Sequence, residues 1–170
     1  MLSTVYSAGL FGIDGYIVTV ECNARSRIPE FQLVGLPDLA VKEAKERVRA
    51  ACENSGIYFP SMDLTLNLAP ADRKKEGSAF DLAILVGVLR ADGRIPEGDG
   101  ADCFIGELSL SGEVRPVRGM LCMCAAAAKA GLTEFYVPVE NAAEASYTKF
   151  SFQLDQEVFS DISVSMESLA

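Results

Sequence analysis

The chain contains no histidine and no tryptophan among its 170 residues. Without histidine the commonest general base is missing, and a Ser-His-Asp triad cannot be formed. No apolar run approaches the roughly 20 residues that a membrane-spanning helix needs. The first residues lack a basic segment and are interrupted by glycines, so they do not predict a secretory signal. We therefore expect a cytoplasmic protein that has no membrane partner.

The sequence also lacks the patterns that mark metal sites and disulfide frameworks. Its cysteines are odd in number and irregularly spaced, and no histidine accompanies them. They are Cys22, Cys52, Cys103, Cys122 and Cys124. We predict reduced thiols that pack as small apolar side chains, with no bound metal.

No glycine-rich phosphate-binding loop is present. A Walker-type lysine loop is absent, and the spacing of Gly9, Gly12 and Gly15 does not fit the dinucleotide fingerprint. These glycines are better explained as turn residues of a first hairpin. We therefore expect this domain to bind no cofactor by itself.

The formal net charge is −9, so the chain as a whole should repel nucleic acid. The basic residues are nevertheless concentrated in a few segments, which leaves room for a local basic face. They are Arg25, Arg27, Arg47, Arg49, Arg73, Lys74, Lys75, Arg115 and Arg118.

Hydrophobic periodicity predicts interleaved strands and helices in one domain over residues 1–170. The expected strands are a hairpin within 3–24, then 31–34, 62–68, a second hairpin formed by 104–110 and 113–117, and 134–137. The expected helices are 39–55, which Asp38 would cap and Gly56 would end, then 80–89 and 120–130. The fold class is α+β, with a mixed sheet and helices in two layers.

Ser78 follows a charged glycine turn and precedes the apolar helix, which is a common place for a nucleophile. A nearby lysine could activate it, as in Ser-Lys hydrolases. Alternatively, Ser78 caps the helix that begins near Ala79 and needs no base. We favour the cap, because Lys74 and Lys75 would have to fold back sharply to reach the hydroxyl.

Asp81 is the most unusual carboxylate, because it lies inside an otherwise apolar helix. An unpaired buried carboxylate is costly, so we expect it to bind a backbone amide or a cation such as Lys75 or Arg115. We predict a structural anchor rather than a catalytic acid.

Four segments together resemble a known family: FQLVGLPDLAVKEAKERVRAACENSG, NLAPADRKKEGSAFDLAI, GELSLSGEVRPVRGML and VPVENAAEAS. In this order they are similar to the N-terminal domain of the Mg-chelatase-like AAA+ ATPases, the YifB/ComM family. The resemblance covers residues 1 to about 147, with Ala83 where proline is expected, and fits loosely from Thr148 on. It implies the fold of the Lon proteolytic domain and of the RadA C-terminal domain, which is the ribosomal-protein second-domain-like fold.

Lon-type proteases use a Ser-Lys dyad, and the resemblance places its two members on apolar residues here. The serine position falls on Ala79 and the lysine position on Leu121, while the next lysine, Lys129, is about two helical turns further on. The resemblance therefore implies no catalytic residue in this domain. The alternative is a Ser-Lys peptidase or hydrolase that uses Ser78.

The resemblance also implies a longer parent protein with an AAA+ motor, which would bind ATP and Mg²⁺ and form a ring, a hexamer in our expectation. Members similar to ComM act in DNA branch migration. The expected partners are the parent's own AAA+ domain, the other ring subunits and DNA. A contact surface for them would comprise Arg73, Lys74, Lys75, Arg115 and Arg118. Alternatively, these charges pair with Glu76, Asp81 and Glu107 and contact nothing else.

Overall fold

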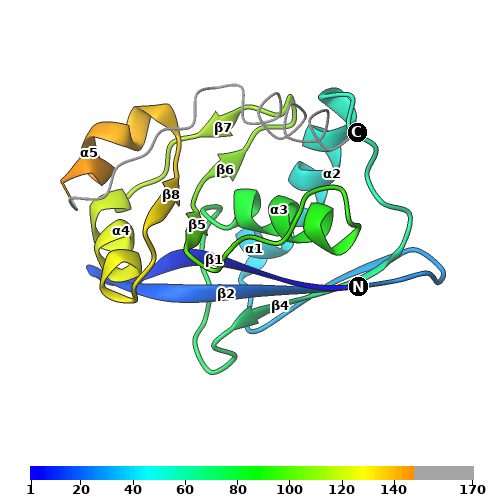
Figure 1. Cartoon of the computed structure of the whole chain (residues 1–170), viewed down its shortest axis with the longest axis horizontal. Helices are drawn as coiled ribbons and strands as arrows, with labels where there is room; N and C mark the ends of the chain where they lie inside the picture. The colour runs from blue at the N-terminus through cyan, green and yellow to red at the C-terminus, as the bar shows by residue number, and fades with distance from the viewer. Residues whose placement is uncertain (148–170) are drawn as a thin grey trace.

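The described structure is built on a six-stranded mixed sheet in the order β3-β4-β2-β1-β5-β8, of which β1, β2 and β4 lie along the lower side in Figure 1. The computed structural model describes residues 1–147; residues 148–170 of the predicted domain lie outside the described residues. The sheet strands are β1 Leu2–Phe11, β2 Asp14–Arg25, β3 Glu30–Val34, β4 Asp63–Ala69, β5 Asp102–Phe104 and β8 Glu134–Tyr136. A separate antiparallel pair consists of β6 Glu107–Leu108 and β7 Val114–Arg115. The mixed sheet with helices confirms the predicted fold class.

The helices lie beside this sheet (Figure 1). They are α1 Leu39–Lys42, α2 Ala44–Asn54, α3 Asp81–Ala91, α4 Met120–Lys129, the short 3-10 helix Val139–Asn141 and α5 Ala142–Ser146. The predicted helix 39–55 is thus interrupted at Glu43. Asp38 caps it as predicted, because its carboxylate accepts a hydrogen bond from the Val41 amide at 2.8 Å.

Helix α3 is buried along its whole length, which explains its uninterrupted apolar sequence. It packs on β1 and β2 on one side and on α2 on the other. Residues that alternate along β2, such as Val18 and Val20, belong to the same core cluster as α3. The period of two in the sequence therefore places one face of the hairpin against this helix.

Helix α4 packs against the opposite face of β1 and β2. Ile17 lies with Ala8 and Met123 in a second core cluster, separate from that of α3. At Gly15 the backbone of α4 comes so close that a Cβ would lie 2.1 Å from the Cys122 carbonyl oxygen. The sheet is therefore covered by a helix on each face at its inner strands β1 and β2, which refines the predicted two layers.

The predicted strand 104–110 is divided into two strands. Residues up to Phe104 pair with β1 and β8 in the main sheet. After Ile105 donates to the Tyr136 carbonyl, the Gly106 amide turns to the Ala79 carbonyl at 2.9 Å. The chain thereby leaves the sheet next to the start of α3, and β6 and β7 form a hairpin over that helix.

All five cysteines are free thiols, and all except the half-buried Cys122 are buried. Burial raises the pKa of the Cys22 thiol to about 12. Within residues 1–147, no group of three or more cysteine, aspartate or glutamate side chains is placed to hold a metal ion. In the same range, no helix has the length and apolarity to cross a membrane.

Candidate functional site

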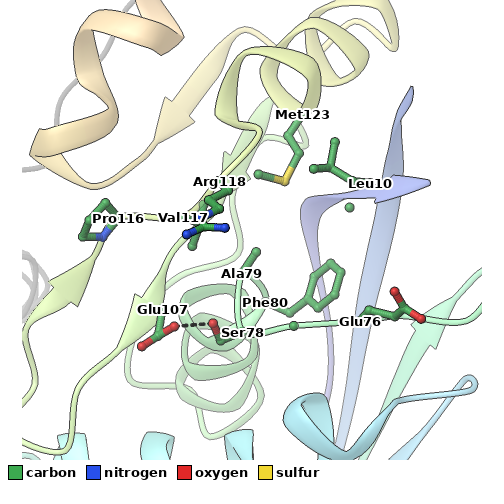
Figure 2. A pocket seen from close by; sticks show the side chains of 12 residues that line it. Leu10, Glu76, Ser78, Ala79, Phe80, Glu107, Pro116, Val117, Arg118 and Met123 are labelled. Carbon is green, nitrogen blue, oxygen red and sulfur yellow. Dashed lines mark hydrogen bonds between the residues drawn. The ribbon is translucent and has the colours of Figure 1, made fainter. Parts of the chain in front are cut away.

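A cavity of about 430 Å³ lies at the start of α3 (Figure 2). Its walls come from the end of β1, the loop before α3, the start of β6, the segment between β7 and α4, and the first turn of α4. The lining residues are Gly9, Leu10, Glu76, Gly77, Ser78, Ala79, Phe80, Glu107, Pro116, Val117, Arg118 and Met123. The charged loop and the hairpin that the sequence singled out thus meet at one site.

Ser78 lies in the wall of this cavity, where its hydroxyl donates a hydrogen bond to the Glu107 carboxylate (Figure 2). The prediction that Ser78 caps the helix is wrong. Helix α3 begins at Asp81, and its N-cap Phe80 makes no side-chain cap bond. The cap was mispredicted because the amide of Gly106, a residue far along the chain, donates a hydrogen bond to the Ala79 carbonyl. This contact shifts the start of the helix.

Lysine is absent from the residues that line the cavity. The Lys74 ammonium lies 3.3 Å from the Glu76 carboxylate. The Lys75 ammonium is fully buried and donates to the Gly35 carbonyl at 2.8 Å and to the Pro70 carbonyl. Neither contact brings a lysine nitrogen to the Ser78 hydroxyl.

Lys75 must be removed from the predicted contact surface, because its side chain has no exposed area. Burial lowers the pKa of its ammonium, and the nearby Asp72 carboxylate opposes this shift only in part. Its backbone also joins two loops: the amide donates to the Leu36 carbonyl and the carbonyl accepts from the Asp38 amide. The prediction from sequence missed that backbone carbonyls alone can accept the hydrogen bonds of a buried lysine ammonium.

The two positions aligned with a Ser-Lys dyad differ in their surroundings. Ala79 lines the cavity, whereas Leu121 is not among the lining residues. Leu121 lies in the first turn of α4 with its side chain 41% exposed, and its amide donates to the Glu144 carboxylate at 3.0 Å. Arg118 and Met123 approach the cavity from this part of the chain instead (Figure 2).

Asp81, directly beneath the cavity wall, is held by a bidentate ion pair. Arg47 of α2 donates through Nε at 2.6 Å and through Nη2 at 2.9 Å, and the Leu108 amide of β6 donates at 3.1 Å. Burial raises the pKa of Asp81, although the Arg47 hydrogen bonds act to lower it. The carboxylate thus joins α2, α3 and β6 at one point.

The bonded cation is Arg47, and neither Lys75 nor Arg115, the two cations named from the sequence, bonds this carboxylate in the described structure. One sequence signal could have identified Arg47. It lies three residues after Ala44 and four before Ala51, both buried, and so shares the inner face of α2.

The remaining predicted contact residues are exposed. The Arg73 guanidinium lies over the Tyr16 ring at 4.5 Å and near the Phe11 ring at 5.9 Å. Arg115 is in β7, and Arg118 lines the cavity across from Ser78 (Figure 2). Of the four exposed bases, Arg118 lines the cavity, whereas the other three lie close in sequence to residues that do.

Comparison with known proteins adds the family. Residues 20–141 match the family described as subunit ChlI of Mg-chelatase. An uncharacterized protein of Mycobacterium tuberculosis is 44% identical over 146 residues, which is 85% of this chain and 29% of that protein. Competence protein ComM of Haemophilus influenzae is 40% identical over 85% of this chain and 28% of its own length. Protein YifB of Salmonella typhimurium is 40% identical over 84% of this chain and 28% of its own length.

The chain thus spans less than a third of the length of these curated relatives. A Lon protease of Mycolicibacterium smegmatis is a more distant match, 28% identical over 76% of this chain and 17% of its own length. These matches agree with the predicted resemblance to YifB and ComM and with the predicted likeness to Lon.

Proposed function

This chain belongs to the Mg-chelatase ChlI subunit family, and from that membership we propose that it is a non-catalytic accessory domain of a larger AAA+ ATPase. The parent protein would bind ATP and Mg²⁺ through its motor and not through these 170 residues, which contain no Walker motif. It would act on DNA in the cytoplasm as a hexameric ring, in a role related to competence, as the name of the relative ComM suggests. The domain would contribute to ring assembly and to contact with DNA or another substrate.

The contacts of the serine in the cavity wall and of the two nearby lysines support the proposal that the domain is non-catalytic. In a Ser-Lys mechanism, a neutral lysine accepts the serine proton before attack. Here the Ser78 hydroxyl donates a hydrogen bond to Glu107. The Lys74 ammonium is paired with the Glu76 carboxylate, and the Lys75 ammonium donates to the Gly35 carbonyl. A site with these features supports binding rather than peptide hydrolysis.

The exposed bases around the cavity support the contact part of the proposal. Arg73 and Arg118 make no salt bridge within the described residues, so no carboxylate neutralises the charge of their guanidinium groups there. Phosphate contacts with arginine and lysine make binding weaken steeply as the salt concentration rises. The overall charge of −9 opposes such binding, so we expect it at low salt.

Fluorescence anisotropy with labelled duplex and four-way-junction DNA tests the contact. We expect binding at about 20 mM salt that falls as salt rises, and a shallower slope when Arg73, Lys74 and Arg118 become alanine. Lys129→Ala is the matched control, because Lys129 is an exposed base in the last turn of α4, outside the cavity. Absence of binding at low salt would contradict the DNA contact for this domain.

A further inference from the structure

Leu36 adopts a backbone conformation that disfavours its own side chain. Its φ is 57°, and among non-glycine residues of the described structure it alone has a positive φ. Residues with a Cβ rarely occupy this region, and a residue before proline prefers an extended backbone instead. Glycine would occupy the position at no steric cost. The presence of leucine therefore lowers the stability of the fold.

The surrounding contacts hold this conformation in place. The preceding Gly35 approaches β4 so closely that a Cβ would lie 2.2 Å from the Leu68 carbonyl oxygen. The Leu36 carbonyl accepts from the Lys75 amide at 3.0 Å, and the buried Lys75 ammonium donates to the Gly35 carbonyl at 2.8 Å. Because these bonds fix both sides of the residue, the loop cannot relax to relieve the strain.

The Leu36 side chain gains only partial burial in return. It is 53% exposed, and Leu39, three residues later, is 73% exposed. We call these two side chains the leucine knob. Strained residues of this kind occur mostly at sites of contact or function, because the strain is not otherwise compensated. The knob therefore has the properties of a docking element.

The 430 Å³ cavity, whose lining mixes apolar and charged residues, adjoins the knob in the same molecule. The Asp38 carboxylate, which lies in sequence between the two leucines, accepts a hydrogen bond from the Gly77 amide at 3.2 Å. Gly77 lines the 430 Å³ cavity, whose apolar wall includes Leu10 and Phe80 (Figure 2). The knob and the cavity are therefore adjacent, on the two sides of the hydrogen bond between Asp38 and Gly77.

We propose that the leucine knob of one copy docks into this cavity of a second copy, in a pair related by a two-fold axis. Because knob and cavity adjoin, an axis near the Asp38–Gly77 contact would bring each knob to the other copy's cavity. Such an interface is self-complementary, with the same surface used twice.

The charges at this place favour a second copy as the occupant. A chain with a net charge of −9 repels its own copies over most of its surface. The loop between knob and cavity is different, since it carries two bases and two acids. These exposed residues are Asp72, Arg73, Lys74 and Glu76. Across a two-fold axis, each base can face an acid of the other copy. The pairing would use the same loop as the proposed DNA contact, but it requires neither DNA nor the ATPase parent, so it goes beyond the proposed function.

Leu36→Gly provides the discriminating test, because it removes the knob's side chain and relieves the backbone strain. Sedimentation equilibrium from about 10 to 500 μM should show the natural chain approaching a dimer and the variant staying monomeric, within the affinity range of small interfaces. The variant should also unfold at a temperature about 2–4 °C higher. Higher stability combined with lost association is not expected of a leucine with a purely structural role.

Two further variants locate the interface. Leu110→Ala is the matched control, since Leu110 is 58% exposed in the β6–β7 hairpin and does not line the cavity. It should leave the dimer unchanged, whereas Pro116→Glu at the cavity rim should weaken it. A natural chain that stays monomeric at 500 μM, or a Leu36→Gly chain that associates equally well, would overturn the proposal. A lower unfolding temperature for Leu36→Gly would overturn the strain argument on which it rests.

Discussion

Asp81→Ala should destabilise the fold by about 3–5 kcal/mol, the usual cost of removing one partner of a buried ion pair. The Arg47 side chain is 18% exposed and would lose both carboxylate bonds. The Leu108 amide would lose its acceptor as well. Since domains of this size are stable by about 5–15 kcal/mol, this is a large fraction of the total. For a denaturant dependence of about 2 kcal/mol per molar urea, the midpoint should fall by about 2 M.

Two variants separate the ion pair from the loss of side-chain volume. Asp81→Asn keeps an oxygen that can accept from the Leu108 amide, so its cost should be smaller than that of alanine. The double change Arg47→Met with Asp81→Leu removes both charges together. It should therefore be more stable than the sum of the two single changes predicts, because no unpaired charge stays buried.

Urea unfolding followed by circular dichroism measures each variant. Glu76→Gln is the matched control, because its ion pair with Lys74 joins two side chains that are each 64% exposed. Exposed pairs contribute little, so the control should change stability by less than about 1 kcal/mol. An Asp81→Ala chain that loses less than about 1 kcal/mol, or a strictly additive double variant, would refute the anchoring role.

Three other predictions follow from buried or bonded side chains. Lys75→Ala should lower the free energy of unfolding in urea by about 2–5 kcal/mol, because it leaves two carbonyls without a donor. Lys74→Ala should change that free energy by less than about 0.5 kcal/mol. Equal effects of the two changes would contradict the burial of Lys75. Burial raises the pKa of buried thiols such as Cys22 to about 12 from 9.0, so above pH 9 the unfolded chain releases protons that the native chain keeps. Stability should therefore fall by about 1.4 kcal/mol per pH unit per thiol between pH 9 and 12, with a shallower slope for Cys22→Ala; a flat profile would be inconsistent. A fluorophosphonate probe should leave Ser78 unlabelled, as judged by intact-protein mass, and labelling that Ser78→Ala abolishes would restore the hydrolase alternative.

Local features of this chain were predictable from its sequence. The alternation along β2 and β4 reflects the period of a strand with one buried face. Asp38 caps α1 because a capping bond joins residues only three apart. Gly56 follows Ser55, the C-cap of α2, and has a φ of 73°, as a helix-ending glycine should. In each case the determining interaction lies within a few residues, and the order of side chains therefore carries the information.

The cavity and its supports were decided by the tertiary structure. Arg47 and Asp81 are 34 positions apart in sequence, and their pairing depends on how α2 packs against α3. The burial of Lys75 and the exposure of Leu36 both depend on the contact between the loops that contain them, which are distant in sequence. Composition cannot distinguish a buried lysine from a surface one, because the difference lies in the carbonyls that surround it. The sequence by itself determined the family and most of the strands and helices, whereas through-space contacts decided where several of these elements begin or break and which charged and apolar side chains face solvent.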